Sequence, residues 1–231
     1  MKKKLYDVNE LKEYGETWFN WAKDEREVDL TYYGNWQKDF GKLIIELAEL
    51  EGSIETILDV GCATALNLRA IDELGVFGKL YGTDISEYMI NMIPSLHDFG
   101  SYAEFYTTPA WDQPMISDNS IDFILCTHVL EHIPDEDLLD KTLKEFKRIL
   151  YKDGKIIIIM PIKTSPDEEK THSIIKNSIW WSKTFSKHFK SETTNARKKF
   201  KATKLKPNRK HKNTFYDEYD EVWKIYRLIQ K

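Results

Sequence analysis

The sequence contains little cysteine and no long apolar run. Its 231 residues include 2 cysteines, Cys62 and Cys126, too few for a disulfide framework and without the spacing of zinc ligands. No apolar stretch approaches the roughly 20 residues that span a bilayer, and the opening segment, MKKKLYDVNELKEYGE, has no apolar signal-peptide core. We therefore expect a cytoplasmic protein with no membrane partner, in which both cysteines are reduced.

Charge is abundant but unevenly distributed. The chain has a formal net charge of −4. Residues 163–215 hold 15 Lys and Arg against 4 Asp and Glu, whereas the first 162 residues hold 30 acidic against 16 basic side chains. This pattern indicates either an anionic partner for the basic segment or a solvated segment that only offsets the acidic body.

Apolar runs alternate with helical periodicities along the chain. Residues 7–50 show helical spacing in two pieces. The expected strands are 56–60, 78–84, 103–108, 121–127 and 155–161, separated by helices and followed by a helix at 173–189 and strands at 199–205 and 220–229. This order predicts an α/β fold in which helices flank a seven-stranded, mostly parallel sheet.

Two of the expected strands end in residues suited to holding a nucleotide. The stretch DVGCATALNL places Gly61 directly after the first strand, where a side chain would occupy ligand space. Asp84 ends the second strand, where a carboxylate can accept hydrogen bonds from two ribose hydroxyls. A dinucleotide is disfavoured because Ala63 and Leu66 stand at two of the glycine positions of G-x-G-x-x-G.

Four ordered segments extend this pattern. ILDVGCATA, LYGTDISEYMI, SDNSIDFILCTHVLEHIPD and LYKDGKIIIIMP occupy successive strand ends across residues 55–161. Together they resemble the class I S-adenosylmethionine-dependent methyltransferases, particularly the methyltransferase-11-like group that acts on small molecules. The resemblance implies a Rossmann-like fold, S-adenosylmethionine as the methyl donor and S-adenosylhomocysteine as the product.

The resemblance also implies a domain organisation. We interpret residues 1–231 as a single class I methyltransferase domain. In this interpretation residues 1–52 form an N-terminal helical cap or lid and residues 53–162 form the donor-binding core. Residues 163–231 then supply the acceptor side and the C-terminal strands.

The resemblance assigns donor-binding roles by position. Asp59 faces the methionine amino group, Asp84 the ribose, and Ile85 and Met89 the adenine. The family often has an acid after strand three for the adenine amine; here either Asp112 fills that role or, if Asp112 is out of register, Trp111 stacks on the adenine. The full predicted donor set is Asp59, Gly61, Cys62, Ala63, Asp84, Ile85, Met89, Trp111, Asp112, Thr127 and His128.

Ala63 and Ala65 depart from the glycine-rich pattern of the family. If either position requires a positive φ, alanine costs roughly 1 kcal/mol there. That cost is small against the roughly 8 kcal/mol of a micromolar complex. We therefore expect the loop to bind the donor, with reduced affinity.

The turn THVLEHIPD supplies the candidate catalytic residues. The resemblance implies that His132 removes a proton from the acceptor; the alternative is that His132 braces the turn. His128 is the second candidate and also lines the donor pocket. For the acceptor we expect Tyr33, Trp36, His172 and Trp181, and no metal, because the sequence shows no evident carboxylate cluster for Mg²⁺.

Three functions remain open from the sequence. The first is methyl transfer to a hydroxyl or amine of a small anionic acceptor, such as a sugar, a nucleotide-linked sugar or a phosphorylated metabolite. The second is an RNA or tRNA methyltransferase that uses the basic 163–215 segment. The third is a non-catalytic binding protein with a degenerate donor loop. A monomer and a homodimer are both compatible with the sequence.

Overall fold

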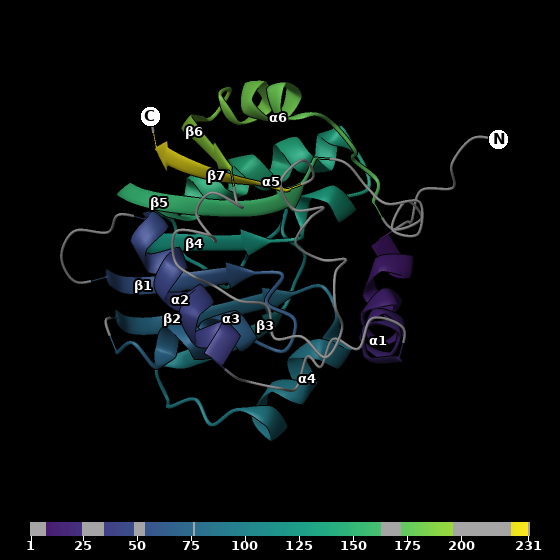
Figure 1. Cartoon of the computed structure of the whole chain (residues 1–231), viewed down its shortest axis with the longest axis vertical. Coiled ribbons are helices and arrows are strands. Elements are labelled where there is room, and N and C mark those ends of the chain that lie inside the picture. Colours follow the sequence, from purple (N-terminus) through teal and green to yellow (C-terminus); the bar gives the residue numbers. More distant parts are fainter. Residues whose placement is uncertain are drawn as a thin grey trace.

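The computed structural model contains a sheet of seven strands in the order β3-β2-β1-β4-β5-β7-β6 (Figure 1). The structure describes residues 8–24, 35–48, 54–75, 77–162, 172–195 and 223–230. The strands are β1 (Ile54–Val60), β2 (Phe77–Asp84), β3 (Ala103–Thr107), β4 (Ile121–Thr127), β5 (Leu150–Pro161), β6 (Phe189–Asn195) and β7 (Trp223–Gln230). The first five are parallel, and β7 runs antiparallel to both β5 and β6.

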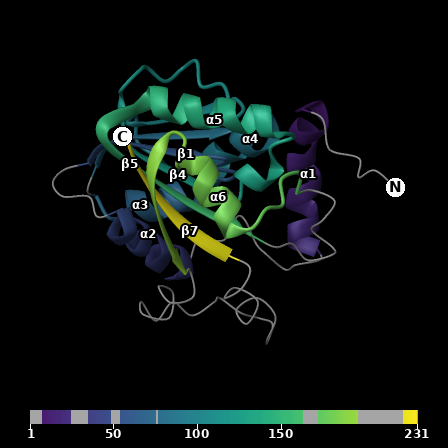
Figure 2. The ribbon, with the colours of Figure 1, turned by 90° about the horizontal axis from the view of Figure 1, so that it is seen from above.

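Helices cover both faces of this sheet. They are α1 (Val8–Asp24), α2 (Asn35–Ala48), α3 (Leu66–Asp72), α4 (Glu87–Leu96), the short 3₁₀ helix η1 (Leu130–His132), α5 (Glu136–Ile149) and α6 (Ser178–Phe185). Figure 2 shows α5 on one side of the sheet and α2 and α3 on the other. The predicted α/β architecture is confirmed.

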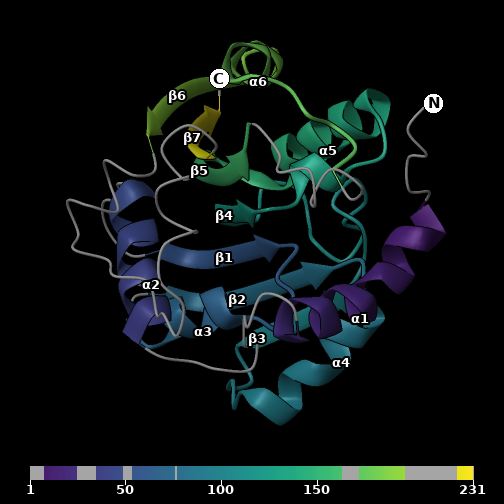
Figure 3. The same ribbon diagram turned by 45° about the vertical axis from the view of Figure 1, so that its right-hand side comes forward.

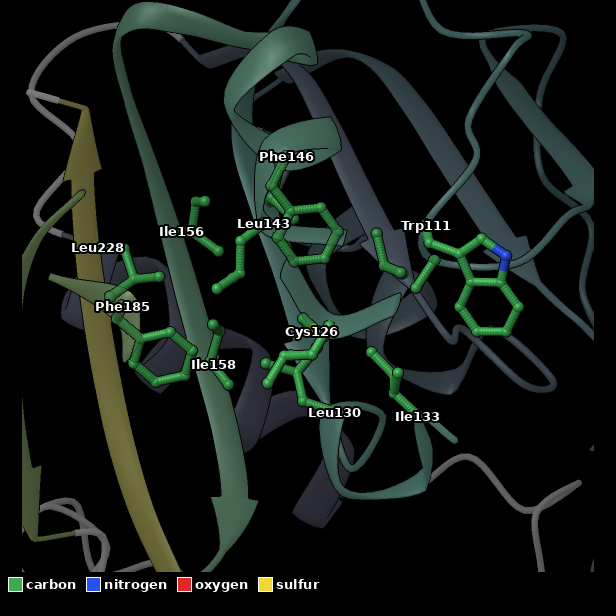
Figure 4. Packing of buried hydrophobic residues seen from close by; sticks show 14 of the residues in the cluster. Trp111, Cys126, Leu130, Ile133, Leu143, Phe146, Ile156, Ile158, Phe185 and Leu228 are labelled. Atoms are coloured by element: carbon green, nitrogen blue, oxygen red, sulfur yellow. The ribbon is translucent and has the colours of Figure 1, made fainter. Parts of the chain in front are cut away.

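The core consists of two layers separated by the sheet. Ile156 and Ile158 of β5 pack on the side of α5 and α6, and Ile157 and Ile159 pack on the side of α2 and α3. β5 is apolar at successive positions because both of its faces are covered. Figure 4 shows the α5 side, where Phe146 of α5 lies over the strands.

The C-terminal part differs from the predicted pattern. The expected helix at 173–189 is the shorter α6, and β6 begins at Phe189, in the last position of that range. The strand expected at 199–205 lies outside the described residues. β6 was not predicted because its sequence, FKSETTN, is mostly polar; its pairing with β7 is a tertiary contact between segments far apart in the chain.

The parallel strands bring the predicted functional segments to one edge. β1, β2 and β4 are neighbours that run in the same direction, so their carboxyl ends meet. Figure 3 shows α1 on the side at which these strands end. Within the described ranges, no helix combines the length and the apolar character needed to cross a membrane.

Candidate functional site

The loop after β1 is held in left-handed backbone conformations. The φ angles are 72° at Gly61, 47° at Ala63 and 60° at Ala65. The backbone N–H groups of Gly61 and Cys62 both donate to the carbonyl of Thr83, at 2.7 and 3.0 Å. Both alanines therefore occupy the region that costs an L-residue about 1–2 kcal/mol.

Gly61 also lies against the turn after β4. A Cβ atom at position 61 would overlap Cγ2 of Val129. Glycine is therefore needed twice at this position, for its positive φ and for the close approach of the loop to the turn. The two candidate segments consequently form one packed unit.

Asp84 fastens the same loop to the end of β2. Its Oδ2 accepts a hydrogen bond from the N–H of Ala63, and its Oδ1 accepts one from the N–H of Ser86, both at 2.9 Å. Burial raises the pKa of this carboxyl, while the backbone donors and the charge of nearby His132 partly oppose the rise. The carboxylate remains partly exposed, with a second lone pair on each oxygen.

Asp59 is the least satisfied polar side chain of the site. It is completely buried, and neither carboxylate oxygen has a hydrogen-bond partner among the described residues. Burial raises the pKa of its carboxyl well above the usual range, and the charge of Asp84 raises it further. The side-chain amide of Asn67 lowers this pKa in part, and its Nδ2 also donates to Thr127 Oγ1, at 3.2 Å. A buried carboxylate whose oxygens lack hydrogen-bond partners is suited to a cationic ligand.

The turn after β4 places a buried carboxylate between histidines. His128 has a φ of 57°, and its N–H donates to the carbonyl of Ile159. Its Nδ1 lies 3.2 Å from Oε1 of Glu131, which is 1% exposed. Burial would raise the pKa of Glu131, but the hydrogen bond with His128 and the charges of His132, His128 and His172 lower it overall. The histidines around Glu131 therefore favour its charged form.

His172 reaches this turn from a different part of the chain. The N–H groups of Ser173 and Ile174 donate to the carbonyl of Glu131, at 2.7 and 3.1 Å. The His172 ring meets that of His132 edge to face, with a centroid distance of 4.8 Å. The structure thus brings together two histidines that are 40 positions apart in the sequence.

The start of α4 borders the site on the β2 side. The Ser86 side chain caps α4 by accepting from the N–H of Met89, which is buried. Ile85, just before the cap, is partly buried against the core. At Gly15 of α1 an added Cβ would overlap the Ser86 side chain, so α1 packs closely against this helix start.

The comparison with protein families rests on the same segments. Residues 58–158 match the family model described as a methyltransferase domain, Methyltransf_11. Residues 58–158 are therefore similar to a methyltransferase domain, as the ordered sequence segments predicted. The donor that the sequence predicted, S-adenosylmethionine, is bound in the structure of a Haemonchus contortus phosphoethanolamine N-methyltransferase 2, which has a TM-score of 0.65 at 16% identity to this chain.

Individual relatives are distant. A ubiquinone biosynthesis O-methyltransferase of Hydrogenovibrio crunogenus is 29% identical over 138 residues, which cover 58% of this chain and 54% of that protein. The chain therefore spans about half the length of that curated relative.

Solved structures show the same fold at low identity. A Haemonchus contortus phosphoethanolamine N-methyltransferase 2, in complex with phosphomonomethylethanolamine and S-adenosylhomocysteine, has a TM-score of 0.69 at 16% identity. The match covers 98% of this chain and 60% of that one. The structure of a complex between the Haloferax volcanii Trm112 methyltransferase activator and a methyltransferase has a TM-score of 0.66 at 16% identity. That match covers 91% of this chain and 96% of that one.

The residues predicted to contact adenine differ in exposure. Trp111 is 9% exposed and packs at the edge of the core, near Ile133 (Figure 4). Asp112, the next residue, is exposed. Cys62 is buried in the donor loop, where burial raises the pKa of its thiol well above the usual range.

The predicted acceptor residues are distributed unevenly. His172 lies beside His132, but Trp181 is fully buried and stacks on Phe185, with centroids 5.5 Å apart. This placement gives Trp181 a packing role, and it has no part in the acceptor site proposed below. Tyr33 and the side chain of Trp36 lie outside the part of the chain that the structure describes.

Several residues at the site were not singled out from the sequence. Asn67 orients Thr127, Val129 contacts Gly61, and Gly15 allows α1 to approach α4. Asn67 and Val129 stand inside recognised motif segments, so their positions were a usable signal. Gly15 carries no local signal, because its contact is with a residue about 70 positions away.

Proposed function

We propose that the protein transfers the methyl group of S-adenosylmethionine to a hydroxyl of a small anionic acceptor, with an amine as the alternative acceptor atom. The observation that carries this proposal is the pair of carboxylates at the ends of β1 and β2. Asp59 is buried with both oxygens unbonded within the described structure, and Asp84 is partly exposed beside it. The pair matches a ligand that has an ammonium group at one end and vicinal hydroxyls at the other.

The donor contacts follow from this pair. Asp84 accepts hydrogen bonds from the ribose hydroxyls with its remaining lone pairs, and Asp59 receives the methionine ammonium group. Ile85 and Met89 form the apolar wall for the adenine. The rest of the predicted donor set lines the intervening space: Gly61, Cys62, Ala63, Trp111, Asp112, Thr127 and His128.

Methyl transfer then needs alignment and one proton acceptor. The acceptor oxygen attacks the methyl carbon in line with the carbon–sulfur bond, whose electron pair passes to sulfur. The S-adenosylhomocysteine formed is neutral at sulfur. His132, which is close to Asp84, accepts the proton that leaves the acceptor hydroxyl. His128 is the second candidate for this role, although its Nδ1 is occupied by Glu131.

The class of acceptor is supported by two relatives. The curated relative is named as an O-methyltransferase, which favours a hydroxyl. The Haemonchus protein was solved in complex with phosphomonomethylethanolamine, a small phosphorylated molecule, which favours an anionic acceptor.

The proposal is tested by calorimetric titration of S-adenosylmethionine and S-adenosylhomocysteine. We expect micromolar binding by the wild type and at least a tenfold loss, about 1.4 kcal/mol, in Asp84→Ala. Asp98→Ala, which removes an exposed carboxylate beyond α4, is the matched control and keeps the wild-type affinity. Acceptors are then screened in the order sugars, nucleotide-linked sugars and phosphorylated metabolites.

Donor titration, together with a measurement of RNA binding, separates this proposal from a non-catalytic binding protein and from an RNA methyltransferase. Absence of donor binding at millimolar concentration would contradict the enzyme proposal and leave a non-catalytic binding protein. Donor binding together with RNA binding that falls steeply with salt would favour the RNA methyltransferase instead.

A further inference from the structure

We propose that Glu131, His132 and His172 bind a divalent transition-metal ion. One potential ligand atom from each of these residues lies within 4.8 Å of the other two. Glu131 and His172 are buried, and His132 is partly exposed. The three side chains therefore form a small, mostly enclosed cluster with one side open.

The carboxylate of Glu131 gives an independent indication of a ligand. Its Oε1 is engaged by His128 Nδ1, but its Oε2 is buried and has no hydrogen-bond partner in the described ranges. An unsatisfied buried polar atom costs about 1–3 kcal/mol, and more when it is charged. A bound cation at Oε2 removes that cost, and an unplaced ion is a recognised explanation for such an atom.

The backbone holds the cluster in place without the metal. The carbonyl of Glu131 accepts from the N–H groups of Ser173 and Ile174, which joins the segment of His172 to the turn after β4. The N–H of His132 donates to the carbonyl of Val129, at 3.0 Å. His128 fixes the orientation of the carboxylate, as outer residues do around many metal sites.

The ligand atoms of Glu131, His132 and His172 determine the class of metal. Two imidazoles and one carboxylate suit Zn²⁺, Co²⁺, Mn²⁺ or Fe²⁺, whereas Mg²⁺ and Ca²⁺ prefer oxygen ligands. Three protein ligands leave at least one coordination position for another molecule. The sequence predicted no metal, because it has neither zinc-ligand spacing at its cysteines nor an evident carboxylate cluster for Mg²⁺; His172 joins Glu131 and His132 only in the folded chain.

The role of the metal rests on the methyl transfer proposed above. An acceptor hydroxyl that coordinates at the open position would lose its proton to solvent more readily, because a bound cation stabilises the oxyanion. The oxygen then attacks the methyl group as before, and the electron pair passes to sulfur. In that state His132 is a ligand, and the cation takes over from its imidazole the role of promoting deprotonation.

The test is titration of the full chain, freed of metal by chelation, with Zn²⁺ and Mn²⁺ in the absence of donor and acceptor. We expect one ion per chain, and at least a tenfold loss of affinity in His172→Ala and in Glu131→Gln. His188→Ala is the matched control, because His188 contacts the carboxylate of Asp140 at 2.8 Å outside the cluster and should leave affinity unchanged. The visible absorption of bound Co²⁺ reports on the coordination number and geometry, and it should change in His172→Ala.

The outcomes are distinct. Absence of binding to the folded wild type at millimolar metal, or equal binding by wild type and variants, would overturn the proposal. Circular dichroism and urea unfolding check that each variant is folded; if Glu131→Gln is not, His132→Asn replaces it. Titration of S-adenosylmethionine into the same variants separates loss of the metal from failure of the proposed methyltransferase function.

Discussion

At the scale of single residues, the donor site is dominated by a carboxylate that its own fold leaves unsatisfied. Asp59 has no hydrogen-bond partner in the described structure, and its pKa is raised by burial and by Asp84. Folding therefore costs this group its hydration, and a bound ammonium group would compensate for that loss. The same feature links stability and ligand affinity to pH.

This linkage predicts the behaviour of Asp59→Asn. Because the folded state holds the proton of Asp59 more tightly than the unfolded state, wild-type stability from this group falls as pH rises from the ordinary pKa through the raised one. Asp59→Asn removes this pH-dependent loss. The difference in free energy of unfolding, variant minus wild type, should therefore grow with pH, by up to about 1.4 kcal/mol per pH unit. Urea unfolding between pH 5 and pH 8 measures it.

Donor affinity should show the opposite trend in the wild type. The ammonium group of the donor favours ionised Asp59, so the affinity rises with pH across the same window, and the variant binds weakly with little pH dependence. If stability and donor affinity depend on pH in the same way in the wild type and in Asp59→Asn, the assignment of Asp59 to the donor ammonium group is contradicted.

At the scale of elements, two loops that follow different strands behave as one unit. The loop after β1 contacts the turn after β4 through Gly61 and Val129, and it is bound to the end of β2 through Asp84. The motif predicted that these segments share one edge of the sheet. It did not predict that Val129 fills the space beside Gly61.

The contact predicts energetic coupling between Gly61 and Val129. Gly61→Ala introduces a methyl group that overlaps Val129 and adopts an unfavourable φ, so it should destabilise the protein by more than the roughly 1–2 kcal/mol of the backbone term alone. Val129→Ala in the same chain should recover part of the loss. We expect a coupling free energy of about 0.5–3 kcal/mol, measured by urea unfolding of both single variants and the double variant.

Gly75 provides the control for this cycle. It has a φ of 63°, and a Cβ there would meet nothing within 4 Å. Gly75→Ala should therefore show the backbone cost alone and no coupling to Val129→Ala. If the effects of Gly61→Ala and Val129→Ala on the free energy of unfolding add within about 0.5 kcal/mol in the double variant, the predicted coupling would be contradicted, because the overlap would then be relieved in another way.

At the scale of the whole molecule, the parallel sheet collects groups from distant segments at one edge. Asp59 and Asp84 lie at the ends of β1 and β2, His132 follows β4, and α1 packs on the start of α4 next to them. A ligand that contacts all of these segments binds the folded chain and not the unfolded one. Donor binding should therefore be visible as global stabilisation.

The stabilisation has a defined size. At a concentration of S-adenosylhomocysteine 100 times its Kd, the folded state gains about 2.7 kcal/mol. For a chain of this length that corresponds to a rise in Tm of roughly 5–11 °C. Thermal unfolding followed by circular dichroism measures it, and Asp84→Ala at the same ligand concentration should show a much smaller rise. Equal shifts in both proteins would place the ligand elsewhere.

The sequence by itself determined the strand–helix order through residue 161 and the identity of the residues at the strand ends. Apolar periodicity is local, and the rule that parallel strands end at one edge then brings Asp59, Gly61 and Asp84 together. Only the tertiary structure decided that His172 lies beside His132, that Trp181 fills the core and that β6 pairs with β7. These are contacts between segments far apart in the chain, and they depend on how whole layers pack, which short patterns of residues do not encode.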